Sequence, residues 1–293
     1  MVKFEKDGEN MEKKKCLVIY HNDLDGQCSA AIAGKMLSNY YEMYYVKAQW
    51  DEPIDLPTDW SGFEKLCILD FSLEEKLLNK LMRIFTNENI VWVDHHVSKM
   101  DMYAKYQDIP GFRIDGTAAC ELTWKYFFDM TKMPMFIKWI GDRDLWKFNY
   151  GDDTKNFCEY MSYQDTTPES IIWSFLFEKT HMKYYLDKGK DLRRAKLFRI
   201  NQVIKNNVYE SVIDGVKCMK INYSDGESIS DVAHIMLTNY DVDIAWVYFY
   251  KQVDGHMMEI NSLRSTDNVD VSLIAKDKGG GGHKNAAGWS IIK

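Results

Sequence analysis

Potential metal ligands follow three short apolar segments of the chain, each of which has the composition of a β-strand. Because the carboxyl ends of parallel strands open on one crevice of an α/β sheet, side chains at these positions are expected to lie together. A fourth acidic pair stands at the end of a helical segment. The candidates are His21, Asp23 and Asp25 after residues 16–20, Asp70 after residues 65–69, Asp94, His95 and His96 after residues 89–93, and Asp142 and Asp144.

This combination of side chains is typical of a divalent metal site. Crowded carboxylates repel one another, so such a cluster is tolerated mainly when cations occupy it. Imidazole mixed with several carboxylates suits manganese, magnesium or iron better than a structural zinc site, which favours sulfur. Two ions about 3.5–4 Å apart are the usual device for phosphoryl chemistry. Asp70, central among the ligands, is the candidate bridge between the ions.

Each cluster also has a purely structural interpretation. An Asp after a strand often only caps the next helix, and Asp23 and Asp25 by themselves favour that interpretation. Adjacent histidines are harder to explain by packing, because neighbouring side chains of an extended chain point to opposite sides. The coincidence of four clusters favours the metal site. For Asp144 two roles stay open, support of the metal site or capping of Arg143 at the surface.

The elements that must position these residues alternate between strands and helices. Repeated units of this kind predict an α/β fold with a doubly wound, mostly parallel sheet that helices cover on both faces. The expected strands are residues 16–20, 41–50, 65–69 and 89–93, and the expected helices are residues 29–37, 73–85, 118–129 and 135–146.

A helical connector is expected to join this domain to a smaller one. From about Pro168 the pattern predicts one long helical region, which is rich in Lys and Arg between Lys179 and Asn207. The basic face of this region is either solvated or lines a cleft between the domains and attracts phosphates. The remaining chain predicts a smaller α/β domain with a mixed sheet. The expected organisation is a catalytic domain at residues 12–165, a connector at 166–207 and a C-terminal domain at 208–293.

Composition excludes several classes of protein. With 293 residues, of which 46% are hydrophobic and 14% aromatic, the chain can bury a core and is not disordered. Its 37 Lys and Arg against 44 Asp and Glu give a net charge of -7, which argues against broad neutralisation of long duplex nucleic acid. The six cysteines are scattered and are expected to be small core or surface residues. Without an apolar stretch of about 18 residues, we expect a cytoplasmic protein that does not enter a membrane.

The order of the motifs resembles the DHH phosphoesterase superfamily. HNDLDG at residues 21–26, a strand-terminal Asp, DHH at 94–96 and GD at 141–142 are similar to its four motifs. SLRS at 262–265, followed by VSLIAKDKGGGGHKNAAG at 271–288, resembles the substrate-binding motif of the DHH-associated C-terminal domain. The superfamily includes RecJ-like exonucleases, nanoRNases, phosphatases of 3'-phosphoadenosine 5'-phosphate, cyclic-dinucleotide phosphodiesterases and manganese pyrophosphatases.

The resemblance implies a role for each matching residue. His96 is implied to contact the scissile phosphate or to assist protonation of the leaving oxygen, and Asp94 to orient a histidine through a hydrogen bond. For His21 a ligand role and a supporting role stay open, because some members carry this histidine four residues before the first Asp, where this chain has Ile19. The implied ligands of two Mn²⁺ ions, or of Mg²⁺ or another divalent metal, are Asp23, Asp25, Asp70, His95, Asp142 and His21.

In the C-terminal domain the resemblance implies substrate binding. Glycines let the backbone approach an anion closely, and a guanidinium fork matches phosphate geometry. Taken alone, the same residues predict only a tight turn and a surface arginine. The implied substrate-binding residues are Arg264, Ser265, Gly280, Gly281, Gly282 and His283, with Lys284 as additional charge.

Together these implications predict a Mn²⁺-dependent phosphodiesterase, a hydrolase with exonuclease or nanoRNase activity. Short single-stranded oligonucleotides or dinucleotides are the expected partners, and two-metal-activated water would convert them to nucleoside 5'-monophosphates. The alternatives are a phosphatase of 3'-phosphoadenosine 5'-phosphate, a cyclic-dinucleotide phosphodiesterase, and a non-catalytic nucleotide-binding scaffold. The oligomeric state stays open, with a homodimer as one option.

Overall fold

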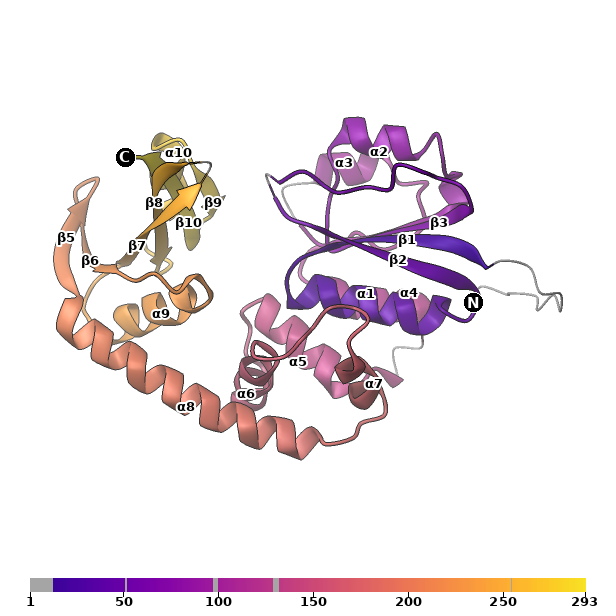
Figure 1. The fold of residues 1–293 in the computed structure, drawn as a ribbon. Helices are drawn as coiled ribbons and strands as arrows, with labels where there is room; N and C mark the ends of the chain where they lie inside the picture. The colour runs from indigo at the N-terminus through magenta and orange to yellow at the C-terminus, as the bar shows by residue number, and fades with distance from the viewer. Residues whose placement is uncertain (1–12, 51, 97–99, 129–131, 254) are drawn as a thin grey trace. The chain divides into compact units, whose positions relative to one another are not determined.

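The computed structural model describes residues 13–50, 52–96, 100–128, 132–253 and 255–293. Two compact units make up the chain, Met1–Arg193 and Arg194–Lys293, and each builds its own sheet (Figure 1). The long helix α8 (Met182–Asn207) begins in the first unit and ends in the second.

A parallel sheet of four strands forms the centre of the N-terminal unit. The spatial order is β2-β1-β3-β4, and residues 16–20 of β1 are all buried. Because alternate side chains of a strand point to opposite faces, both faces of such a sheet need cover. The strands are β1 (Lys14–His21), β2 (Tyr41–Ala48), β3 (Phe63–Leu69) and β4 (Ile90–Val93), and the short 3₁₀ helix η1 (Asn87–Asn89) precedes β4.

Helices cover both faces, so the predicted doubly wound α/β fold is confirmed (Figure 1). Val18 and the other inward side chains of one face pack against α1 (Leu24–Leu37) and α4 (Ala119–Phe127). Leu17 and Ile19 on the opposite face pack against α2 (Glu75–Leu81) and α3 (Met100–Lys105). Small side chains such as Ala30 and Ala33 bring α1 close to the sheet.

A helical layer completes the N-terminal unit. Its helices α5, α6 and α7 share a core with α1 and α4 around Phe136 and Phe157. The sequence pattern missed α6, and the single helical region expected from residue 168 to residue 207 is wrong. The chain breaks between α7 and α8 because Lys179 and His181 adopt left-handed backbone conformations, which a helix cannot contain. The bounds are α5 (Met135–Asp144), α6 (Asp152–Met161) and α7 (Ile171–Phe177).

A mixed six-stranded sheet forms the C-terminal unit, in the order β5-β6-β7-β8-β10-β9. β6 and β7 are parallel, and the other neighbours are antiparallel. Helix α9 packs on one face together with Ile200 and Ile204 of α8, and α10 packs on the other. The sequence missed the edge strand β5. The bounds are β5 (Tyr209–Ile213), β6 (Val216–Asn222), η4 (Gly226–Ser228), α9 (Ile229–Asn239), β7 (Ile244–Val253), β8 (His256–Ser265), α10 (Val271–Asp277), β9 (Gly281–His283) and β10 (Ala286–Ile292).

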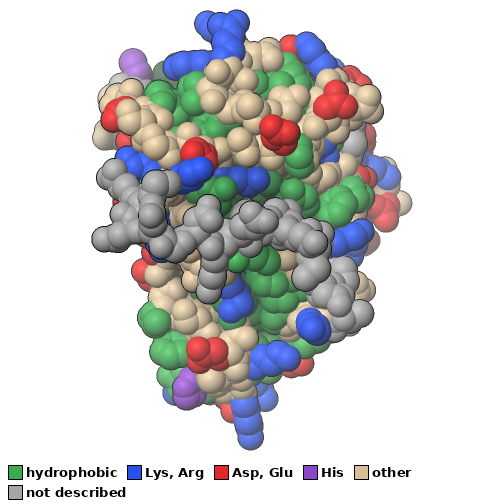
Figure 2. Space-filling view, turned by 90° about the vertical axis from the view of Figure 1, so that its right-hand side faces the viewer, with side chains coloured by type: hydrophobic (Ala, Val, Ile, Leu, Met, Phe, Trp, Pro, Cys, Tyr) green, Lys and Arg blue, Asp and Glu red, His purple; other side chains and the backbone are tan. Residues whose placement is uncertain are grey.

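The cysteines of the chain are core residues, which is one of the two placements expected from the sequence. All six cysteines are buried and free of disulfide bonds. Across the described ranges, no helix combines the length and the apolar character that crossing a membrane requires. On the face seen in Figure 2, Lys and Arg side chains are interspersed with Asp and Glu side chains.

Candidate metal centre

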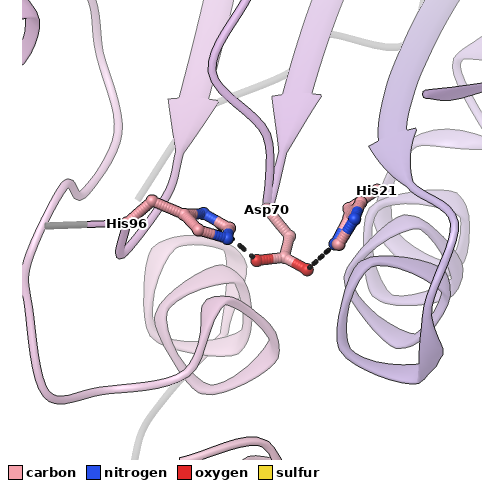
Figure 3. A group of neighbouring side chains, drawn as sticks. All are labelled: His21, Asp70 and His96. Atoms are coloured by element: carbon pink, nitrogen blue, oxygen red, sulfur yellow. Dashed lines mark ion pairs between the residues drawn. The ribbon is translucent and has the colours of Figure 1, made fainter. Parts of the chain in front are cut away.

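The carboxyl ends of β1, β3 and β4 bring three predicted residues together. Asp70 follows β3 and is buried, with His21 from the end of β1 on one side and His96, just after β4, on the other (Figure 3). Nδ1 of His21 lies 3.5 Å from Oδ2 of Asp70, and Nδ1 of His96 lies 4.0 Å from Oδ1. These three side chains form a first group with the composition and spacing of metal ligands.

A second group of potential ligands adjoins the first through Asp70. It consists of Asp25 from the first turn of α1, His95, and Asp144 at the end of α5. Nε2 of His95 lies 3.7 Å from Oδ2 of Asp25, 3.5 Å from Oδ2 of Asp144 and 3.2 Å from Oδ1 of Asp70. Asp70 is therefore close to both groups, as a carboxylate that bridges two ions has to be.

The backbone at the strand ends holds this arrangement. Asp70 has a left-handed conformation, with φ of 56°, and its N–H donates to the carbonyl of Val93 at 2.8 Å, which ties the end of β3 to β4. A Cβ on Gly26 would lie 2.2 Å from the carbonyl oxygen of His21, so only glycine lets α1 start this close to β1. Left-handed non-glycine residues are uncommon and cluster at functional sites.

The donor set around Asp70 fits divalent cations. Both of its side-chain oxygens are buried and have no hydrogen-bond donor among the residues that the structure describes. Burial raises the pKa of Asp70 well above its ordinary value, and the charges of Asp25 and Asp23 raise it further. A buried carboxylate without a donor destabilises a fold. A divalent cation would ligate the oxygens and reverse the pKa shift, and manganese, magnesium and iron accept this mixture of ligands.

The pKa of His21 is raised, whereas burial alone would lower the pKa of an imidazole. Its Nδ1 lies 2.8 Å from Oδ2 of Asp23. Burial lowers the pKa of His21, but the close contact with Asp23 and the charges of Asp23 and Asp70 outweigh burial and raise the pKa to about 10. The protonated ring is thus a counter-charge for these carboxylates. A metal ion that binds His21 has to displace this proton.

Asp23 and Asp25 also have structural roles. Asp23 is the N-cap of α1 and accepts a hydrogen bond from the N–H of Gly26 at 2.9 Å, which confirms the capping interpretation for Asp23. Asp25 accepts hydrogen bonds from the N–H groups of Ala119 and Cys120, both at 2.8 Å, at the start of α4. Capping and metal binding do not exclude each other, because a carboxylate has about four lone-pair sites.

Asp94 is fully buried and orients His96. Its Oδ1 lies 2.6 Å from Nδ1 of His96 and accepts the backbone N–H of His95 at 2.8 Å, and its Oδ2 accepts the hydroxyl of Ser72 at 2.5 Å. Burial raises the pKa of Asp94, but His96, Ser72 and the Tyr103 hydroxyl outweigh burial and lower it overall. An ionised carboxylate at this distance favours the His96 tautomer with a proton on Nδ1, which leaves Nε2 for a further partner. The sequence did not indicate that Ser72 and Tyr103 support Asp94, because neither residue belongs to a recognisable motif.

Asp142 does not join the group, and Asp144 does. Successive residues of a helix are rotated by about 100°, so residues two apart on α5 point in nearly opposite directions. Asp142 accepts hydrogen bonds from the N–H groups of Asn149 at 2.7 Å and Tyr150 at 3.2 Å and from the hydroxyl of Thr154 at 2.5 Å. These bonds fix the loop before α6. The structure therefore brings Asp144, not Asp142, to His95.

Two predicted substrate-binding residues share one face of the C-terminal sheet. Ala286 of β10 pairs with Arg264 of β8 on one side and with His283 of β9 on the other. Arg264 donates to the carbonyl of Leu263 at 2.9 Å and to the hydroxyl of Ser230 at 3.1 Å. Burial lowers its pKa, and none of the described carboxylates forms an ion pair with it. A half-buried guanidinium with neutral partners fits an anion.

The other residues of this motif shape the sheet edge. The hydroxyl of Ser265 donates to the carbonyl of Val269 at 2.8 Å, which is a structural contact. Gly281 and Gly282 lie in the edge strand β9. Gly282 has φ of 140°, and a Cβ there would come within 2.5 Å of the carbonyl oxygen of Ala286, so the close approach of β9 to β10 depends on glycine. At Gly280 a Cβ would lie 2.1 Å from a carbonyl oxygen of β10.

Comparison with known proteins identifies the C-terminal domain. Residues 214–293 match the DHHA1 domain, which confirms the resemblance for this part of the chain. Uncharacterized protein R106 of Acanthamoeba polyphaga mimivirus is 28% identical over 235 residues, which cover 78% of this chain and 53% of that protein. The chain thus spans about half the length of this curated relative.

Two solved structures are similar along nearly the whole chain. A manganese-bound exonuclease RecJ has 12% sequence identity and a TM-score of 0.49, and the match covers 95% of this chain and 86% of that one. The pGpG-specific phosphodiesterase PggH of Vibrio cholerae also has 12% identity and a TM-score of 0.49, with 96% and 94% covered.

Proposed function

We propose that this protein is a metal-dependent phosphodiesterase of the DHH phosphoesterase superfamily. The observation that carries the proposal is Asp70, a buried carboxylate without a hydrogen-bond donor among the described residues, 3.5 Å from His21 and 3.2 Å from His95. Packing gains nothing from such a carboxylate, whereas a pair of divalent ions requires a ligand between them. The DHHA1 domain at residues 214–293 supports the same family.

Two Mn²⁺ ions, or other divalent ions with similar ligand preferences, would share Asp70. When bound, such ions supply an activated water and neutralise charge on the phosphate. The arrangement of the donors favours Asp144 over Asp142 as the last ligand. The proposed ligands are His21, Asp23, Asp25, Asp70, His95 and Asp144.

His96 is the proposed catalytic residue of the chain itself. Asp94 would hold one proton at Nδ1, and a second proton at Nε2 could then be donated to a phosphate oxygen or to the leaving oxygen. Trp50 packs edge-on against this ring, with centroids 5.3 Å apart, and limits its rotation. Asp94 therefore acts as a positioning residue through His96.

The proposed substrate is a short single-stranded oligonucleotide or a dinucleotide, hydrolysed in the cytoplasm to nucleoside 5'-monophosphates. Arg264 and His283 would bind a terminal phosphate, because a guanidinium fork and an imidazole both donate to phosphate oxygens. A net charge of -7 suits short substrates better than long duplexes.

A time course with Mn²⁺ on 5'-phosphorylated RNA of two to about 20 nucleotides tests this proposal. We expect rapid loss of the shortest chains with release of mononucleotides. Asp70→Asn should abolish the reaction, while Asp55→Asn, which changes an exposed carboxylate of the same unit, should leave the rate unchanged.

Three outcomes would contradict the proposal. Full activity of Asp70→Asn would show that the site is wrong. If no RNA is cleaved although Mn²⁺ binds, the substrate assignment is wrong, and 3'-phosphoadenosine 5'-phosphate and cyclic dinucleotides become the substrates to test. Absence of both cleavage and metal binding would indicate a nucleotide-binding scaffold.

A further inference from the structure

A cavity of about 840 Å³ lies within the N-terminal unit, at residues that the proposed reaction does not use. It is formed by the end of α6, the segment that follows it, helix α7 and the start of α8. Cavities of roughly 300–1,000 Å³ are typical of sites for small molecules. The lining residues are Tyr160, Gln164, Asp165, Glu169, Ser170, Ile171, Ile172, Phe175, His181, Tyr184 and Tyr185.

Aromatic rings make up much of this wall and are packed against one another. Tyr160 and Tyr185 stack with centroids 5.0 Å apart, and Tyr184 meets Tyr160 edge-on at 6.2 Å. His181 lies 6.2 Å from Phe175, also edge-on. Tyr184 is nevertheless 52% exposed, although Nζ of Lys188 lies 5.8 Å from its ring centroid, and Phe175 is 40% exposed, so both rings keep surface that a ligand can reach.

The charged groups of the lining are all acidic. Asp165 and Glu169 belong to the lining, and it contains no Lys or Arg. Asp165 accepts hydrogen bonds from the N–H and the hydroxyl of Thr167, which hold its carboxylate in place and lower its pKa. Neither carboxylate forms an ion pair with a described residue. The wall therefore offers negative charge that no cation of the pocket itself compensates.

The turn between α7 and α8 places several of the lining residues at the pocket. Lys179 and His181 both have left-handed conformations, with φ of 59° and 60°, which residues with a Cβ rarely adopt. The carbonyl of Phe175 accepts hydrogen bonds from both the N–H and the hydroxyl of Thr180. This turn brings His181 against Phe175 and directs the start of α8, with Tyr184 and Tyr185, back over the pocket.

We propose that this pocket binds a small organic cation that carries an alkylated ammonium group. The faces of aromatic rings attract cations through their quadrupole, and a carboxylate near the rings adds to this attraction. A phosphate or another anion would be repelled by Asp165 and Glu169. Among the described residues, Asp165, Glu169 and His181 do not come close enough together to form a group of metal ligands. The pocket is thus complementary to a ligand that is both apolar and positively charged.

Choline is the probe for this site, and its neutral isostere 3,3-dimethylbutan-1-ol is the matched control ligand. In calorimetric titrations of the full chain, choline should bind at least about tenfold more tightly than the neutral alcohol, because only the charge differs. Tyr184→Ala should weaken choline binding at least about fivefold. Tyr163→Ala, which removes a nearby ring that is 59% exposed and outside the lining, should change it less than about twofold.

A double variant, Asp165→Asn with Glu169→Gln, tests the charge without removing a ring. We expect it to weaken choline binding and to leave binding of the neutral alcohol unchanged. Equal affinity for choline and the alcohol would overturn the proposal in favour of a merely apolar cavity. Binding of adenosine or guanosine without choline would overturn it in favour of a nucleobase site, and no binding of any probe would overturn it as well.

Discussion

The carboxylates around Asp70 in the N-terminal unit and the half-buried guanidinium of Arg264 in the C-terminal unit differ in how their charge can be relieved. The carboxylates around Asp70 can take up protons, and burial raises the pKa values of Asp70 and Asp25 accordingly. The guanidinium of Arg264 stays charged at any physiological pH, so its neutral acceptors have to suffice. The stability of the metal centre should therefore depend strongly on pH and on bound cations. The region around Arg264 should instead be stabilised by bound anions.

The largest expected effect is on the metal centre. Asp70→Asn removes a buried negative charge that lies among Asp23, Asp25 and Asp144. We expect the metal-free protein to gain about 1 kcal/mol of stability, because repulsion and desolvation are relieved. The rate should fall at least about 1,000-fold. Thermal unfolding with and without Mn²⁺ checks this, since the melting temperature of the variant should no longer rise with the metal.

A pair of variants on α5 sharpens the definition of this centre. Asp144→Asn should lower activity about 100-fold and weaken Mn²⁺ binding, because its carboxylate lies with His95. Asp142→Asn should instead destabilise the fold by about 1–3 kcal/mol, because its oxygens accept hydrogen bonds from Asn149, Tyr150 and Thr154. Metal titrations and unfolding curves of both variants separate the two roles. If Asp142→Asn weakened Mn²⁺ binding and Asp144→Asn only lowered stability, Asp142 would be the ligand.

Arg264 in the C-terminal unit is expected to affect the binding of substrate and not the binding of metal, and its effect on the reaction should be smaller. Arg264→Gln should raise the KM for short oligonucleotides about tenfold and leave kcat nearly unchanged, because the guanidinium would bind a phosphate away from the reacting atoms. The rise in melting temperature with Mn²⁺ should persist. Arg199→Gln, at an exposed position of the same unit, is the control. If the melting temperature of Arg264→Gln no longer rose with Mn²⁺, Arg264 would also affect the metal centre, and this prediction would be wrong.

The sequence predicted the parts of this molecule that depend on local pattern. Strands such as residues 16–20 are apolar on both sides, which indicates a sheet covered by helices, and their final residues mark its carboxyl edge. The scattered cysteines were expected to be small core or surface residues, and all six are buried and free of disulfide bonds. Helix α6 was missed because its sequence, DDTKNFCEYM, is mostly polar and its buried side lies against other helices.

Long-range partners could not be predicted in the same way. Ser72 and Tyr103 support Asp94 from distant parts of the chain, and no local pattern links them. The choice between Asp142 and Asp144, by contrast, had a signal in the sequence. Residues two apart on a helix point in nearly opposite directions. The helix expected at residues 135–146 therefore already implied that Asp142 and Asp144 do not both face one site.

The last expected effect concerns the proton of His21. It changes the stability of the metal-free protein and not the rate, and it tests the pH response of the metal centre directly. The pKa of His21 is raised to about 10 in the folded protein from an ordinary 6.5, so the folded state holds this proton at pH values where the unfolded state has lost it. Its stabilising contribution is complete below about pH 6.5 and disappears as the pH rises through about 10. Relative to His21→Gln, the metal-free protein should therefore lose up to about 3 kcal/mol of stability between pH 7 and pH 10. Denaturant unfolding in the presence of a chelator measures this difference. Parallel curves for the two proteins would show that His21 is neutral at pH 7, and that Mn²⁺ need not displace a proton from this ring.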